Sequence, residues 1–147
     1  MGEIKRPQDF RRINNYIKQN GLTELVEVKG PKFGDSKYEE YRNADLFVFP
    51  TYHHVECFPL VLIEAMQFGL PIITTSTGAI PEIIENEING LIVKKKDVSD
   101  LVDKIELIIK NRGQRAQIGV QARKDYFKKY SLDIFEKSMA KVFSELN

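Results

Sequence analysis

Apolar and polar positions along this chain follow two periods, one typical of helices and one typical of buried strands. Between Asp9 and Gln19 the apolar residues recur every three or four positions, which predicts an amphipathic helix ended by Asn20-Gly21. Short stretches rich in apolar residues predict strands at residues 24–28, 46–50, 72–75 and 91–93, of which those at 46–50 and 72–75 are expected to be buried. Helices are expected at about 35–43, 59–69, 81–86 and 97–109, around Ile118, and from Ser131 onward.

Short strands that alternate with helices indicate right-handed βαβ units and therefore a parallel sheet. The expected fold class is α/β, a Rossmann-like three-layer α/β/α arrangement with a mostly parallel sheet of about four strands. The chain opens on a helix, although such a sheet normally begins with a strand. We therefore expect residues 1–147 to form a single domain whose first strand belongs to a preceding part of the parent protein, with Met1-Gly2 a candidate expression leader.

The composition argues against nucleic-acid-binding, disulfide-rich and membrane-spanning proteins. The chain has 147 residues with 22 basic and 21 acidic side chains, so no electrostatic footprint for nucleic acid stands out. The single cysteine, Cys57, excludes an intramolecular disulfide framework. No stretch approaches the roughly 20 apolar residues of a membrane span, and the N-terminus lacks the apolar core of a signal peptide. A cytoplasmic location is expected, and a peripheral association of the parent enzyme with the inner membrane face is left open.

The helix expected after Pro59 carries two carboxylates in an otherwise apolar surrounding. Glu64 lies inside the apolar run and Glu56 lies just before it, and a buried carboxylate costs several kcal/mol unless something pairs with it. Ligands of parallel α/β sheets bind where strands end and helices begin, here at residues 51–58 and 76–80. A helix N-terminus favours phosphate, and carboxylates accept hydrogen bonds from vicinal hydroxyls. The predicted ligand therefore carries phosphate and sugar hydroxyls.

The stretch "ECFPLVLIEAMQFGLP", residues 56–71, resembles the E-x7-E signature of family-4-type retaining glycosyltransferases with the GT-B fold. "ADLFVFPT" before it and "STGAIPEIIENEINGLIV" after it resemble the same family in the same order. The resemblance covers roughly residues 21 to 130. It implies that this chain is the C-terminal, donor-binding domain of a two-domain enzyme. Its partner would be an N-terminal domain that holds the acceptor site.

The resemblance also implies roles for individual residues. Glu56 is expected beside the transferred sugar as the catalytic residue, and Glu64 on the ribose hydroxyls. The loop from Gly30 to Phe33 is expected near the base. The N–H groups expected to hold the sugar and the pyrophosphate are those of Phe58, Leu60 and Val61. The substrate would be a UDP- or GDP-linked hexose, transferred to a saccharide or a lipid-linked acceptor, with no metal and no cofactor.

Two departures from the family pattern affect this expectation. Pro59 stands at a donor-binding position where many relatives have glycine, and it has no N–H to offer a ligand. The resemblance also implies a basic Arg and Lys pair that neutralises the pyrophosphate, in a segment just after the first strand of the domain, and we expect that segment to lie upstream of this sequence. We therefore expect little or no transferase activity from the isolated chain.

Two alternatives to a transferase stay open on the sequence. One is a module that binds a nucleotide sugar without catalysis. The other is a hydrolase that uses Cys57 as a nucleophile with His53 and His54, or a metal held by the same cluster. The second is disfavoured because adjacent histidines point in divergent directions and the chain has only these two.

Overall fold

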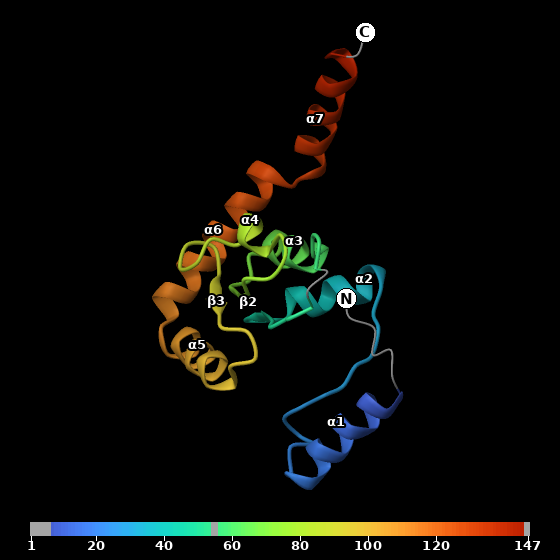
Figure 1. Cartoon of the computed structure of the whole chain (residues 1–147), viewed down its shortest axis with the longest axis vertical. Coiled ribbons are helices and arrows are strands. Elements are labelled where there is room, and N and C mark those ends of the chain that lie inside the picture. Colours follow the sequence, from blue (N-terminus) through green and yellow to red (C-terminus); the bar gives the residue numbers. More distant parts are fainter. Residues whose placement is uncertain (1–6, 54–55, 146–147) are drawn as a thin grey trace. The chain divides into compact units, whose positions relative to one another are not determined.

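The computed structural model describes residues 7–53 and 56–145, which fall into two compact units, residues 1–40 and 41–147. The first unit contains α1 (Pro7–Gln19) and most of α2 (Gly34–Arg42). The second contains the sheet and the remaining helices (Figure 1). The prediction that residues 1–147 form a single domain stays a prediction.

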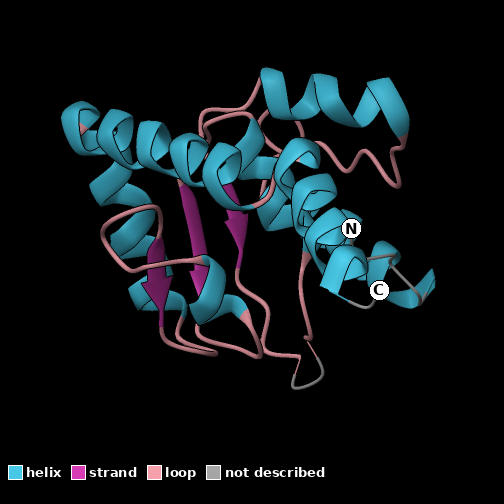
Figure 2. Cartoon of the chain, turned by 90° about the horizontal axis from the view of Figure 1, so that it is seen from above, coloured by secondary structure: helices cyan, strands magenta, loops and turns pink. Residues whose placement is uncertain are grey.

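The sheet of the second unit is parallel throughout its described strands. Its order is β1 (Phe47–Phe49), β2 (Ile72–Thr75) and β3 (Leu91–Val93), with Phe47 opposite Ile72 and Ile73 opposite Leu91. Helices α3 (Leu60–Gln67) and α4 (Ile80–Ile83) connect the strands. They are followed by α5 (Val98–Lys110), α6 (Arg112–Lys129) and α7 (Leu132–Glu145). The predicted three-layer α/β/α class with a parallel sheet is confirmed, and Figure 2 shows the strands side by side among helices.

The core lies between the sheet and α5 and α6. Ile73, Leu91 and Val93 from the strands pack with Ile108 of α5 and Ile118 of α6, all at most 3% exposed. Burial of each such aliphatic side chain stabilises the fold by about 1.5–3 kcal/mol. This core fixes where β1 and β2 end, and hence where their following loops lie.

The predicted strand at residues 24–28 is wrong. Its backbone turns instead, because the N–H groups of Leu25 and Val26 both donate to the carbonyl of Leu22, at 3.0 and 2.9 Å. Leu25 is 81% exposed, so the apolar run is not buried as a strand of a covered sheet would be. The described residues therefore contain three strands rather than four.

Helix α4 is shorter than predicted, ending at Ile83 rather than near Asn86. The side chain of Asn89 supplies the reason, since its Oδ1 accepts from the N–H of Glu85 at 2.8 Å in place of a helical carbonyl. Its Nδ2 donates to the carboxylate of Asp125 at 2.8 Å and to the carbonyl of Ile83 at 3.2 Å. Asn89 thus ends α4 and joins the following turn to α6.

Helix α7 begins at Leu132, one residue after the predicted start at Ser131, and none of its residues is buried. Its apolar side chains Phe135, Val142 and Phe143 are each more than half exposed. Within the described residues no helix is both long enough and apolar enough to cross a bilayer.

Candidate functional site

Helix α3 begins at the carboxyl edge of the sheet, between the ends of β1 and β2. Pro59 is buried and serves as the N-cap, one position before the first helical residue Leu60. The N–H of Leu62 donates to the carbonyl of Pro59 at 3.0 Å. The N–H groups of Leu60 and Val61 precede that bond, so they belong to the first-turn donors that an α-helix cannot satisfy itself. This end of α3 offers an anion both N–H donors and a positive dipole end.

Glu56 lies in the loop before α3 and is half-buried. Its Oε2 accepts a hydrogen bond from the Thr51 hydroxyl at 3.4 Å. Its backbone carbonyl is covered by Gly78, where a Cβ would lie 1.6 Å from the Glu56 oxygen. Gly78 also has φ +55°, a conformation that other residues adopt at a cost. The two loops that the topology predicted to meet therefore do so, and glycine is needed at the point where they touch.

Threonine side chains hold the ends of β1 and β2 together beneath this loop. The Thr51 carbonyl accepts hydrogen bonds from the hydroxyls of Thr75 and of Thr77, the latter at 3.3 Å. The Thr74 hydroxyl donates to the Phe49 carbonyl at 2.8 Å. Because Thr74, Thr75 and Thr77 are at most 2% exposed, these bonds are shielded from water. They fix the backbone from which the Thr51 side chain reaches Glu56.

Glu64 lies in the second turn of α3 and is half-buried. Its Oε2 accepts a hydrogen bond from the Tyr41 hydroxyl at 3.0 Å. Tyr41 is 7% exposed, and its ring stacks on that of Phe68 with centroids 5.5 Å apart. A phenol held in this way orients the carboxylate. Tyr41 lies within the helix predicted at about 35–43, and it was not among the predicted site residues.

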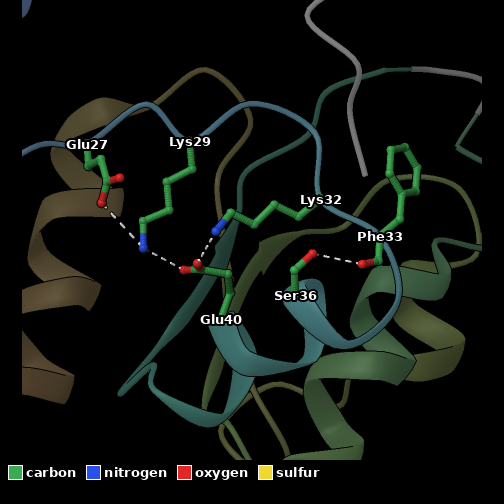
Figure 3. A network of polar contacts seen from close by, with 6 residues as sticks. All are labelled: Glu27, Lys29, Lys32, Phe33, Ser36 and Glu40. Carbon is green, nitrogen blue, oxygen red and sulfur yellow. Dashed lines mark hydrogen bonds and ion pairs between the residues drawn. The ribbon is translucent and has the colours of Figure 1, made fainter.

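Gly30 belongs to the first unit, in a loop held by a group of charged side chains (Figure 3). The Glu40 carboxylate accepts from the ammonium groups of Lys29 and Lys32 at 2.8 and 2.7 Å. Lys29 and Lys32 lower the pKa of the Glu40 carboxyl, and Glu40 in turn raises the pKa of Lys29. The Ser36 hydroxyl donates to the Phe33 carbonyl at 2.8 Å. Glu40, which the sequence analysis missed, thus ties both sides of the Gly30 turn to α2.

Phe58 is 46% exposed, and its ring meets that of Tyr130 edge-on with centroids 6.2 Å apart. Burial, and to a lesser degree the negative charges of Asp125 and Glu82, raise the pKa of the Tyr130 hydroxyl. Tyr130 therefore stays neutral at physiological pH, and its ring supports Phe58 at the entrance of α3.

The structure adds no support for a metal or a thiol site. Within residues 7–53 and 56–145 there is no group of three or more side chains of the kinds that hold a metal ion. Cys57 is exposed. His54, the second histidine of that hypothesis, lies outside the described residues.

The site is therefore a helix N-terminus flanked by two oriented carboxylates at the carboxyl edge of a parallel sheet. The family model of glycosyl transferases group 1 matches residues 2–125 of the chain. The chain belongs to this family. Its structure resembles the C-terminal domain of a group 1 glycosyl transferase from Francisella tularensis, with 28% identity and a TM-score of 0.74 over 86% of this chain and 66% of that one.

Curated relatives of the chain are glycosyltransferases as well. An uncharacterized glycosyltransferase of Methanocaldococcus jannaschii is 33% identical over 125 residues, which is 85% of this chain and 32% of that protein. The capsular polysaccharide biosynthesis glycosyltransferase CapM of Staphylococcus aureus is 38% identical over 105 residues, 71% of this chain and 27% of that protein. The chain thus spans about a third of the length of these curated relatives.

Solved structures show the same fold. Sucrose-phosphate synthase of Thermosynechococcus elongatus has a TM-score of 0.83 at 25% identity, over 96% of this chain and 36% of that one. Anabaena HepE in complex with UDP-glucose has a TM-score of 0.84 at 22% identity, over 97% of this chain and 38% of that one, which supports the fold alone. The predicted Rossmann-like domain of a GT-B glycosyltransferase is confirmed, whereas the roles of single residues stay predictions.

Proposed function

We propose that this chain is the donor-binding domain of a retaining glycosyltransferase that takes a hexose from a UDP- or GDP-linked sugar. In this proposal the N–H groups of Leu60 and Val61 hold the pyrophosphate at the start of α3. Glu64 accepts hydrogen bonds from the ribose hydroxyls. Glu56 lies beside the transferred sugar, and the N–H of Phe58 helps to hold that sugar. The loop at Gly30 contacts the base.

The observation that carries the proposal is the meeting of Glu56, the first turn of α3 and the Gly78 loop at one edge of the sheet. A diphosphate needs donors and positive potential, which the helix start provides. A ribose needs paired acceptors with fixed orientation, which a carboxylate held by Tyr41 provides. A phosphate group and sugar hydroxyls occur together in a nucleotide sugar, and the chain belongs to a family of glycosyltransferases.

Calorimetric titration of the chain with UDP-glucose and a GDP-linked hexose tests the binding role. Replacing Glu64 with Gln removes the charge that accepts from the ribose, so affinity is expected to fall about 10- to 100-fold. Glu85→Gln makes the same charge change at an exposed position and should leave affinity unchanged. Equal affinity of Glu64→Gln and the unchanged chain would remove Glu64 from the site.

Transfer of sugar needs the longer protein, because in the proposal the acceptor site belongs to the partner domain. There the acceptor hydroxyl attacks the anomeric carbon of the sugar from the face that the phosphate leaves. The glycosidic bond forms as the bond to the phosphate breaks, and the leaving phosphate accepts the proton of the hydroxyl. Glu56→Gln in the longer protein should lower the rate of transfer and keep donor binding. The isolated chain should show little or no transfer. A longer protein that binds donor and transfers no sugar to any acceptor would favour the non-catalytic module instead.

A further inference from the structure

A cavity apart from the proposed donor site lies at the opposite edge of the sheet, where β1 and β2 begin. It has a volume of about 470 Å³ and lies between the end of α2, the residues that follow α3 and residues 112–123 of α6. Its base is formed by close backbone approach, since a Cβ on Gly119 would lie 2.4 Å from the Gly69 carbonyl oxygen. Phe68 and the buried ring of Tyr41 also line it. We call this cavity the arginine groove.

Four arginines line the groove, against a single carboxylate, Asp45. They are Arg42, Arg112, Arg115 and Arg123. Among the described residues every ion pair uses a lysine, so none of the four guanidinium groups has a carboxylate partner there. The groove therefore concentrates positive charge, with four guanidinium groups and one carboxylate among its lining residues.

Two of the arginines are held in place by aromatic rings. The guanidinium carbon of Arg42 lies 5.7 Å from the ring centroid of Phe68. That of Arg123 lies 5.6 Å from the ring centroid of Phe127. Such stacking uses the flat face of a guanidinium and leaves its N–H edges available to a ligand.

The other two arginines occupy an unfavourable position. Arg112 and Arg115 lie at the start of α6, where the positive end of the helix dipole repels cations. No acidic residue lies in that first turn to compensate, and the side chain of Asn111 provides the cap. Two cations that each lower stability and that line the same cavity are typical of a binding site.

We propose that the arginine groove binds a phosphate-bearing anion, either a soluble phosphate ester or the headgroup of an anionic phospholipid. Guanidinium forks match the oxygens of phosphate and bind it through paired charge-assisted hydrogen bonds. Several such forks around one small cavity fit a compact group with several anionic oxygens. The proposal does not depend on the donor site, because none of the four arginines is assigned to the nucleotide sugar. The two sites share only Tyr41, whose ring lines the groove and whose hydroxyl donates to Glu64.

Titration of the ¹⁵N-labelled chain with inorganic pyrophosphate, followed by NMR, tests the proposal. Pyrophosphate should shift the amides of Gly69 and Gly119 in a saturable manner. The double variant R112Q/R115Q should bind at this place at least about 10-fold more weakly, since each guanidinium contributes charged hydrogen bonds. Removing cations from the start of α6 relieves the repulsion by the helix dipole, so this variant should fold at least as stably as the unchanged chain.

The matched control is K124Q/K128Q, which removes two charges from the same helix at exposed positions that do not line the groove. It should keep the shifts at Gly69 and Gly119. Shifts confined to Leu60 and Val61, no shifts at all, or equal loss in both double variants would overturn the proposal.

Sedimentation with vesicles distinguishes the two sources of phosphate. Capture by phosphatidylglycerol vesicles and not by phosphatidylcholine vesicles, lost in R112Q/R115Q, would assign the groove to a lipid headgroup. Pyrophosphate binding without such capture would assign it to a soluble phosphate ester.

Discussion

The contact between Gly78 and Glu56 allows a sharp test of how the site is built. An alanine at residue 78 would place its Cβ 1.6 Å from the Glu56 carbonyl oxygen, whereas Cβ atoms essentially never come within 3.0 Å of another heavy atom. The two backbones would have to move apart, at a cost of about 1–3 kcal/mol for an overpacked contact. The left-handed backbone at φ +55° adds about 1–2 kcal/mol for a residue with a Cβ.

Gly78→Ala is therefore expected to lower the free energy of unfolding substantially, since that free energy is typically only about 5–15 kcal/mol. Urea unfolding followed by circular dichroism measures the loss as a lower midpoint at an unchanged slope. Because the displaced backbone is that of Glu56, affinity for UDP-glucose should fall as well.

Gly113→Ala is the control, since its Cβ would meet only the Asn111 Oδ1, at an ordinary 3.6 Å. It lies in the first turn of α6, where alanine should be neutral or slightly stabilising. If Gly78→Ala unfolded at the same urea concentration as the unchanged chain, the two loops would not touch as described and the reasoning would fail.

Three further changes test other contacts. Tyr41→Phe removes the hydroxyl that donates to Glu64, and should cost about 1.5–3 kcal/mol of donor binding free energy if that bond orients the carboxylate, as calorimetry would show. Lys29 and Lys32 lower the pKa of the Glu40 carboxyl, so their contribution to loop stability is present above the ordinary value of 4.5 and is lost as the pH falls through the lowered pKa. A carboxyl NMR titration of Glu40 should show that lowered value, and Lys29→Gln should return it toward 4.5. Asn89→Ala leaves the buried Asp125 carboxylate without one of its donors. The free energy of unfolding, measured with urea, should fall by about 1–3 kcal/mol for each buried polar group left unpaired.

The sequence predicts the central part of the fold well, because the residues that begin and end its strands are adjacent to those strands in sequence. Pro71 precedes β2 and Asn89-Gly90 precedes β3, and both strands lie at their predicted residues, 72–75 and 91–93. The stretch at 24–28 also carries strand-favouring residues, Leu25, Val26 and Val28, but it forms no strand, because a strand also depends on a neighbouring strand that periodicity cannot reveal. The end of α4 depends in the same way on a side chain outside the helix, that of Asn89.

The site also has one part that the sequence predicts and another that depends on contacts between distant residues. The rule for parallel sheets places the loops after β1 and β2 together, and the contact of Gly78 with Glu56 confirms it. The partner of Glu64 could not be predicted, since Tyr41 lies 23 residues away in sequence and reaches Glu64 only in the folded chain. The arginine groove could not be predicted for the same reason, since Arg42 at the end of α2 and Arg123 of α6 line one cavity only in the folded chain.

The central claim is that the start of α3, with Glu56 and Glu64, binds a nucleotide sugar. NMR titration of the ¹⁵N-labelled chain with UDP-glucose and a GDP-linked hexose tests it most directly. The account predicts saturable shifts, for at least one of the two, that are largest at the amides of Leu60, Val61 and Gly78 and are weakened in Glu64→Gln. Shifts with both ligands that lie away from these amides, or that Glu64→Gln leaves unchanged, would contradict it.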